Sequence, residues 1–392
     1  MHLAKRIINV APSATLAVSN LTKQMKARGE DVIDLSIGQP DFETPKHIEQ
    51  AAIEAINNNL TSFYTPASGI LPLREAISAH IEQQTAVHYD PKQIVVTTGA
   101  KFALYALMQV LIDPGEEVLV PIPGWVSYVE QIRLAGGVPR EVVAHANFKV
   151  TVDELEAQRT KKTRAVIINS PQNPTGAVYT RQELTLIGNW ALKHDILVIA
   201  DDIYRDLIYN GTTYASMIEI DPQITANTVL ISGVSKTYAM TGWRIGYMAG
   251  PDKIITAVAT MLGHATGNAT AVAQYAALAA LTETQAPVET MRQAFEERLN
   301  AVYDRLVKIP GFVLDTKPQG AFYLFPNVRR AAQLTNYSSV DDFVGALLEE
   351  TGVALVPGRA FGMPEHARLS YSKDMASLME ALDRIEAFVG NN

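Results

Sequence analysis

From residue 94 onward, the chain repeats a pattern of short apolar runs, Gly/Pro turns and segments with apolar residues at helical spacing. The short runs are rich in Val and Ile and predict strands at 94–98, 118–121, 165–169, 196–200 and 229–231. The helical spacing predicts helices at 101–111 and 181–194. Strands that alternate with crossover helices are typical of an α/β fold, whose mainly parallel sheet is covered on both faces.

The two ends of the chain follow a different pattern. Before residue 94, helices are predicted at 14–28, where Gly29 ends the helix, and at 47–58 and 73–84. After residue 285, the pattern predicts a long amphipathic helix at 291–308, strands at 321–325 and 353–356, and a further strand that carries Arg368. A chain of 392 residues is too long for a single core, and its length suggests two or three domains.

Composition narrows the functional classes. The hydrophobic content of 47% with 19% charged residues is ordinary for a soluble globular protein. A net charge of −8 with scattered basic residues argues against a nucleic-acid partner. The absence of cysteine excludes disulfides, a thiolate nucleophile and a cysteine-type zinc site, and no metal site is expected. Residues 1–10 lack a secretory signal and 269–281 are too few to cross a membrane, so we expect a cytoplasmic protein without a membrane partner.

Several residues whose side chains could bind or react with a ligand follow predicted strands. In parallel sheets, ligands bind beyond the carboxyl ends of the strands. The turn Gly99-Ala100 leads into a predicted helix, whose first N–H groups favour a phosphate. Trp125, Asn173 and Asp201 follow three other strands. Each of these positions also has an ordinary interpretation, as a turn, a packed aromatic ring or a helix cap.

Lys236 is the residue around which this set is organised. It follows the strand at 229–231 among small residues, and Arg244 lies eight positions later between two glycines. A lysine can form a Schiff base with a carbonyl, while an arginine holds an anion such as phosphate. Asp201, at the end of an apolar run, needs a partner such as a protonated ring nitrogen, because burying an unpaired carboxylate is costly. A phosphate, a ring nitrogen, a ring oxygen and an aldehyde together describe pyridoxal phosphate.

The motifs that carry this chemistry also resemble a known family. Asn173-Pro174-Thr175-Gly176, Asp201-x-x-Tyr204, Ser235-Lys236 and Thr241-Gly242-Trp243-Arg244-Ile245-Gly246 are similar to those of fold-type I, class I pyridoxal-phosphate aminotransferases, in particular the bacterial-type aspartate aminotransferase subgroup. The resemblance covers nearly the whole chain.

This resemblance implies a role for each candidate residue. Lys236 is implied to bind the cofactor aldehyde and to move the substrate proton, and Asp201 to hold the ring nitrogen. Asn173 and Tyr204 are implied to bind the ring oxygen, and Trp125 to stack on the ring. The implied phosphate ligands are Arg244, Ser235, the Gly99-Ala100-Lys101 turn and, from the neighbouring subunit, Tyr64. The implied substrate site comprises Arg368, which takes the α-carboxylate, with Gly38, Lys101, Trp125 and Asn173.

The resemblance also implies an architecture. A large cofactor-binding domain at 45–285 is expected to contain a mainly parallel seven-stranded sheet between helices. A smaller α+β domain is expected to combine the N-terminal arm at 1–44 with residues 286–392, and the protein is expected to be a homodimer. Two departures from the family pattern carry expectations of their own. Gly124 stands where many relatives have tyrosine, which predicts a wider entrance, and Gly233 replaces a serine that binds phosphate in some subgroups.

Among the possible reactions, transamination between L-aspartate and 2-oxoglutarate by a ping-pong mechanism is favoured. An aromatic amino acid or prephenate aminotransferase is the main alternative, followed by a C–S lyase and by a non-catalytic regulator that keeps the fold. The regulator is disfavoured because the chain enters the enzyme fold without an added DNA-binding domain. Lys101 bears on substrate choice: either its side chain bends into solvent, or its mobile cation meets the distal carboxylate of a dicarboxylic substrate.

Overall fold

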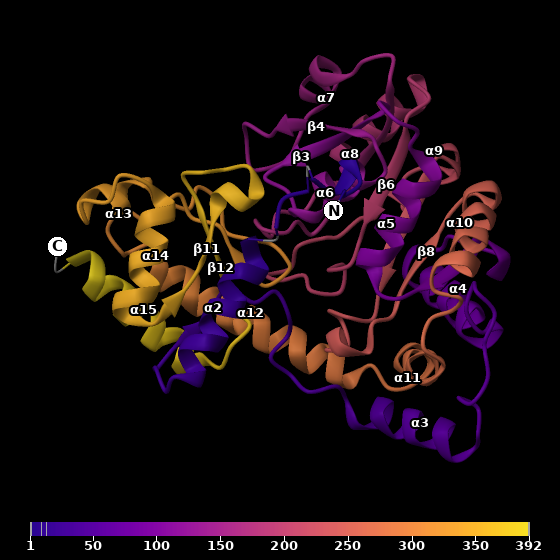
Figure 1. The fold of residues 1–392 in the computed structure, drawn as a ribbon, viewed down its shortest axis with the longest axis horizontal. Coiled ribbons are helices and arrows are strands. Elements are labelled where there is room, and N and C mark those ends of the chain that lie inside the picture. Colours follow the sequence, from indigo (N-terminus) through magenta and orange to yellow (C-terminus); the bar gives the residue numbers. More distant parts are fainter. Residues whose placement is uncertain (1, 9, 13, 391–392) are drawn as a thin grey trace.

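The computed structural model describes residues 2–8, 10–12 and 14–390. The outermost bounds of the predicted domains, Met1 and Asn392, lie outside the described residues. Figure 1 shows a large part built on a sheet and a smaller part of helices and short strands, connected along one side by the long helix α12 (Ala286–Leu306). No helix in the described ranges is both long enough and apolar enough to cross a membrane.

The large sheet has seven strands in the order β2-β8-β7-β6-β5-β3-β4. Strand β8 runs antiparallel to both of its neighbours, and the remaining pairs are parallel. This confirms the predicted mainly parallel seven-stranded sheet. Its strands are β2 (Ile94–Thr97), β3 (Glu117–Ile122), β4 (Val138–Val143), β5 (Thr163–Asn169), β6 (Leu197–Asp201), β7 (Thr228–Gly233) and β8 (Gly246–Ala249).

Both faces of the sheet are covered because successive strand residues point to opposite sides and both sets are apolar. In β5, Ala165 and Ile167 pack in one buried cluster, whereas Val166 and Ile168 pack in another. The first cluster includes residues of α5 (Ala100–Leu111), α6 (Ser127–Leu134) and α10 (Asp252–Ala265). The second includes residues of α7 (Val152–Gln158), α8 (Arg181–Lys193) and α9 (Pro222–Ala226). A third, with residues of β2, β7 and β8, includes residues of α3 (Lys46–Asn57), α4 (Leu71–Thr85) and α11 (Ala271–Thr282).

The smaller part joins the two ends of the chain. After α1 (Lys5–Ile8) and α2 (Ala14–Ala27), strand β1 (Ile33–Asp34) pairs in parallel with β10 (Val353–Ala354). A second sheet has the order β11-β12-β9, with strands β11 (Val356–Pro357), β12 (Ala367–Ser370) and β9 (Tyr323–Leu324). Helices α13 (Arg329–Leu334), α14 (Val340–Thr351) and α15 (Met375–Gly390) complete it. The strands predicted at 321–325 and 353–356 are thus shorter than expected, and the second is divided between two sheets.

The core of the smaller part extends beneath the end of β6. Phe295 of α12 is fully buried, stacks on Phe322 at a centroid distance of 5.4 Å and meets Phe42 edge-on at 5.5 Å. The same buried cluster contains Tyr204 and Leu207, which follow β6. Packing of the smaller part is therefore continuous with the segment that carries Asp201.

Replacing Phe295 by alanine removes the ring that packs against both Phe322 and Phe42. We expect Phe295→Ala to lower the free energy of unfolding by about 3–5 kcal/mol, because a buried aromatic side chain leaves a cavity. Urea denaturation followed by fluorescence measures this loss. Leu186→Ala, at a side chain 56% exposed on α8, is the matched control and is expected to change stability little. Equal effects of the two substitutions would contradict this description of the core.

Candidate active site

A cavity of about 520 Å³ lies where β5, β6 and β7 end, and it is closed on the other side by residues 36–39, α2 and the smaller part of the molecule. Most of the residues predicted for the site line it. They are Gly38, Ala100, Lys101, Trp125, Asn173, Asp201, Tyr204, Ser235, Lys236, Arg244 and Arg368. Gly99 and Tyr64 are the predicted site residues that do not line it.

Lys236 follows β7 and points into this cavity. Its Nζ donates a hydrogen bond of 2.6 Å to the carbonyl oxygen of Gly38. Burial lowers the pKa of Lys236 to about 7, and the positive charges of Arg244, Arg368 and Lys101 act in the same direction. A substantial fraction of the amine is therefore neutral near pH 7, as attack on a carbonyl requires.

Asp201, the last residue of β6, is 3% exposed. Its carboxylate accepts hydrogen bonds from the Tyr128 hydroxyl at 2.6 Å and from the backbone N–H of Ile203 at 3.3 Å. Burial raises the pKa of Asp201 to about 6, although these hydrogen bonds and the charge of Lys236 oppose the shift. Within the described part of the chain no lysine, arginine or histidine forms an ion pair with it. A protonated ring nitrogen would supply the missing cation.

The turn before α5 and Arg244 form a second feature suited to an anion. Gly99 caps α5 with a positive φ of 80°, and a Cβ there would lie 2.2 Å from Nη2 of Arg244. A Cβ on Gly246 would lie 2.2 Å from the backbone nitrogen of Ala100. Both glycines therefore allow the helix N-terminus, the guanidinium and β8 to meet. Free N–H groups beside a guanidinium fit the phosphate of pyridoxal phosphate.

Arg368 of β12 is 3% exposed. It donates to the side-chain oxygen of Asn173 at 3.0 Å and to the carbonyl oxygen of Ser36 at 2.6 Å, while its Nε has no partner. Its guanidinium also lies 4.6 Å from the ring centroid of Tyr323, and among the described residues no carboxylate pairs with it. A buried guanidinium without a counter-charge that lines a cavity is suited to a carboxylate ligand. Since the oxygen of Asn173 faces Arg368, its amide nitrogen is left to donate to a ring oxygen.

Two tyrosines that were not predicted complete the site. Tyr128 holds Asp201, and Tyr323 of β9 forms a hydrogen bond of 2.8 Å with the hydroxyl of Tyr204. A Cβ on Gly38 would lie 2.6 Å from the Tyr323 hydroxyl, so this glycine allows the close approach. Tyr128 lies only three residues after Trp125, which is the one sequence signal that could have identified it; Tyr323 had none, because its partner is far away in the chain.

The mouth of the cavity is formed partly by α2. Ser19 and Lys23 line it one helical turn apart, whereas Val18 and Met25 pack in a cluster of the smaller part. The helix was predicted, but its orientation toward the site was not. On the opposite wall, Nζ of Lys101 lies 5.0 Å from the ring centroid of Trp125. Desolvation and the charge of Arg244 lower the pKa of Lys101, even though much of its side chain is exposed.

Three residues that carried expectations of their own, Gly124, Gly233 and Tyr64, do not line the cavity. A Cβ on Gly124 would lie 2.4 Å from the carbonyl oxygen of Pro121, so the present backbone suits a glycine; the wider entrance stays a prediction. A Cβ on Gly233 would lie 2.8 Å from Cα of Gly246, so this glycine serves the packing of β7 against β8. Tyr64 is 98% exposed and lies outside this cavity, so its expected role requires a second subunit.

Comparison with known proteins agrees with this geometry. Residues 30–385 match the family model described as aminotransferase class I and II. The chain is 51% identical over 391 residues to the aspartate aminotransferase of Geobacillus stearothermophilus, and 51% identical over 389 residues to the asparagine–oxo-acid transaminase of Streptococcus mutans, with 99% of each chain covered in both cases. The solved structure of aspartate aminotransferase from Thermus thermophilus with maleate superposes with a TM-score of 0.93 at 35% identity, covering 99% of this chain and 100% of that one.

The lowered pKa of Lys236 makes a testable prediction about pH. We expect covalent capture of pyridoxal phosphate by the apoprotein to accelerate as pH rises through about 7, because the lysine loses its proton there. Arg368→Gln removes one of the charges that lower this pKa, so its midpoint is expected at higher pH. Arg359→Gln, at an arginine paired with Asp341 outside the cavity, should leave the midpoint unchanged. Borohydride trapping at a series of pH values measures the rate, and a midpoint near 10 would contradict the assignment.

Proposed function

Because this chain belongs to the class I and II aminotransferases, a pyridoxal-phosphate-dependent family, we propose that it exchanges the amino group of L-aspartate with 2-oxoglutarate. The observation that carries the proposal is the charge of the cavity. Among the described residues that line it, Asp201 is the only acid, whereas Lys23, Lys101, Arg244 and Arg368 are basic, as is Lys236 when it is protonated. After the cofactor phosphate and Asp201 are accounted for, this excess positive charge favours a substrate with two carboxylates.

We assign the two ends of such a substrate to two of these cations. Arg368 takes the α-carboxylate, because its guanidinium is buried and has no counter-charge. Lys101 takes the distal carboxylate, because its ammonium lies at the mouth on the wall formed by Trp125. The names of the relatives support this assignment: one acts on aspartate, and another was solved with maleate, which is a dicarboxylate.

The chain's own residues then divide the work of the reaction. Bound pyridoxal phosphate acts as an electron sink when the substrate loses its α-proton. Neutral Lys236 Nζ accepts that proton in the half-reaction of the amino donor. In the half-reaction of the oxo acid, Nζ gives a proton back to the α-carbon. Asp201, fixed by Tyr128, would keep a proton on the ring nitrogen of the bound cofactor, and Asn173 and Tyr204 would donate to its ring oxygen. Amino donor and oxo acid use the same cations in turn, as a ping-pong sequence requires.

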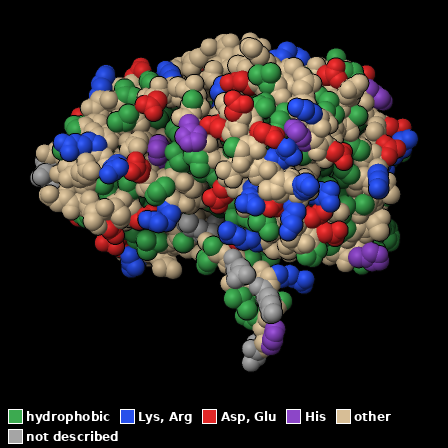
Figure 2. All heavy atoms as spheres, turned by 90° about the horizontal axis from the view of Figure 1, so that it is seen from above, with side chains coloured by type: hydrophobic (Ala, Val, Ile, Leu, Met, Phe, Trp, Pro, Cys, Tyr) green, Lys and Arg blue, Asp and Glu red, His purple; other side chains and the backbone are tan. Residues whose placement is uncertain are grey.

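We also propose that the protein is a homodimer. Tyr64 and Phe63, on the loop between α3 and α4, are 98% and 82% exposed. The start of the chain projects from the body of the molecule (Figure 2). It carries Leu3 and Ile8, which are 59% and 64% exposed. Exposed apolar side chains in such numbers are typical of a surface that another chain covers. A partner there would bring its own Tyr64 toward the phosphate end of the cavity.

The role of Lys101 is tested with substrates that differ in the distal group. We expect Lys101→Ala to lower kcat/KM for aspartate and 2-oxoglutarate by an amount equivalent to about 2–5 kcal/mol, as for a lost charged contact. Activity with phenylalanine and asparagine should fall much less. The half-reaction with each amino donor alone measures the donors, because it omits the dicarboxylate acceptor, and the half-reaction with 2-oxoglutarate alone measures the acceptor.

Lys92→Ala, at an exposed lysine outside the cavity, is the matched control and should behave as wild type. Equal losses for aspartate and phenylalanine would assign Lys101 to the cofactor instead. A wild-type preference for asparagine would favour the activity for which the Streptococcus mutans relative is named, and a preference for phenylalanine would favour an aromatic aminotransferase.

Hybrid dimers test whether Tyr64 acts across the interface. A hybrid of a Lys236→Ala chain and a Tyr64→Phe chain contains one site with both native residues only if Tyr64 serves the neighbouring subunit. We expect such a hybrid to recover one site of native cofactor affinity, although each parent homodimer is impaired. Titration of the separated hybrid with pyridoxal phosphate measures this site. If Tyr64 served its own subunit, the hybrid would contain no native site.

A further inference from the structure

Asp202 is a second buried carboxylate immediately after Asp201, and the proposed mechanism does not use it. It is 2% exposed and does not line the cavity, so its side chain is directed away from the space that Asp201 faces. Its backbone N–H donates to the carbonyl oxygen of Ile231 on β7 at 2.9 Å. The neighbouring strand thus holds the backbone that carries both carboxylates.

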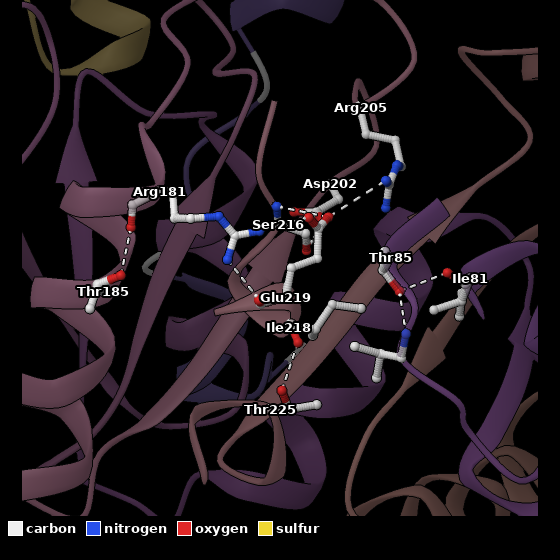
Figure 3. A network of polar contacts seen from close by, with 11 residues as sticks. Ile81, Thr85, Arg181, Thr185, Asp202, Arg205, Ser216, Ile218, Glu219 and Thr225 are labelled. Atoms are coloured by element: carbon white, nitrogen blue, oxygen red, sulfur yellow. Dashed lines mark hydrogen bonds and ion pairs between the residues drawn. The ribbon is translucent and has the colours of Figure 1, made fainter. Parts of the chain in front are cut away.

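A polar network fixes the Asp202 side chain (Figure 3). The Ser216 hydroxyl donates to Oδ2 of Asp202 at 2.5 Å, and the Ser216 backbone N–H donates to Oε1 of Glu219 at 3.1 Å. Glu219 pairs with Arg205 at 3.8 Å and accepts a hydrogen bond from Arg181 at its backbone carbonyl. Asp202 is therefore attached to the segment that precedes α9, none of whose residues in this network lines the cavity.

The charge of Asp202 is not cancelled by a direct partner. In the described ranges, no lysine or arginine nitrogen lies within 4.0 Å of its carboxylate, because Arg205 contacts Glu219 instead. Burial raises the pKa of Asp202 to about 6, the charge of Arg205 opposes this shift, and the charge of Asp201 adds to it. Asp202 is thus mainly ionised at neutral pH. The titratable and charged groups whose interactions reach it are Asp201, Tyr89, Arg205, Tyr214 and Tyr247.

An asparagine could occupy this position without loss of the contact to Ser216, since an amide oxygen also accepts a hydrogen bond. The distinctive property of the aspartate is its negative charge. In the low-dielectric interior that charge acts on Asp201 and on any cation that Asp201 binds. The cation in question is the protonated ring nitrogen of pyridoxal phosphate.

We propose that Asp202 is a positioning residue that acts through Asp201: its buried negative charge strengthens the hold of Asp201 on the protonated ring nitrogen, while the hydrogen bond from Ser216 orients its carboxylate. Both carboxylates then stabilise the proton on the ring nitrogen: Asp201 by direct contact, and Asp202 by its electrostatic field. This inference rests on the family's cofactor and is independent of the preference for aspartate as substrate.

The experiment compares the affinity of the apoprotein for two ligands. One is pyridoxal phosphate, and the other is its analogue in which a CH group replaces the ring nitrogen. We expect Asp202→Asn to weaken binding of pyridoxal phosphate about three- to tenfold, equivalent to a change of half to one pKa unit, and to leave binding of the analogue unchanged. Equilibrium dialysis gives both constants, and neither depends on turnover.

Two further variants separate charge from structure. Ser216→Ala removes the hydrogen bond but keeps the charge, so the ratio of the two affinities should stay close to that of wild type. Arg205→Gln removes an opposing positive charge, so the ratio should change in the opposite direction to that of Asp202→Asn. Equal losses for both ligands in Asp202→Asn, or no loss for either, would overturn the proposal. So would a change of the ratio in Ser216→Ala as large as that in Asp202→Asn.

Discussion

The burial of unlike charges in one cavity, each without its full complement of partners, is the constraint on which the site depends. Lys236, Asp201 and Arg368 all lose hydration there, and desolvation is the largest cause of the pKa shift of each. Such groups are costly in an apolar interior unless a ligand supplies the missing charges. A protonated ring nitrogen, an aldehyde and a carboxylate are the groups that would reduce this cost, which is why the arrangement suits a pyridoxal-phosphate enzyme.

Close backbone contacts and contacts between distant segments hold these groups in place. Gly99, Gly233 and Gly246 bring β7, β8 and the start of α5 to distances that no side chain allows. Across the cavity, three hydrogen bonds join the large part to the segments opposite: Lys236 with Gly38, Asn173 with Arg368, and Tyr204 with Tyr323. Any movement of the smaller part would therefore strain or break hydrogen bonds to the residues assigned to the cofactor.

The residues proposed to select the substrate are not the same set as those proposed to hold the cofactor. The residues assigned to the ring lie at the strand ends, whereas the exposed side chain of Lys101 and the α2 side chains Ser19 and Lys23 form other parts of the lining. Two relatives with the same 51% identity to this chain bear different names, one for aspartate and one for asparagine. Overall similarity therefore assigns the family and its cofactor, and the distal group of the substrate has to be argued from individual side chains.

The sequence by itself determined the elements that local pattern encodes. Five of the seven strands of the large sheet, the two crossover helices α5 and α8, and the cluster of chemically active residues at the strand ends were predicted, because periodicity and turn residues are properties of short segments. The shorter helices α6, α7 and α9 were not predicted. The tertiary structure alone decided what depends on distant partners. The strands β4 and β8 were not recognised, since β4 is an edge strand with a largely exposed pattern and β8, Gly-Tyr-Met-Ala, contains no β-branched residue. Tyr323 and the residues of α2 that line the cavity are far in sequence from the residues they join there. The packing roles of Gly124 and Gly233 depend on which backbone atoms lie where a Cβ would be. Such contacts have no local signature, because they are set by how the two ends of the chain fold back onto the sheet.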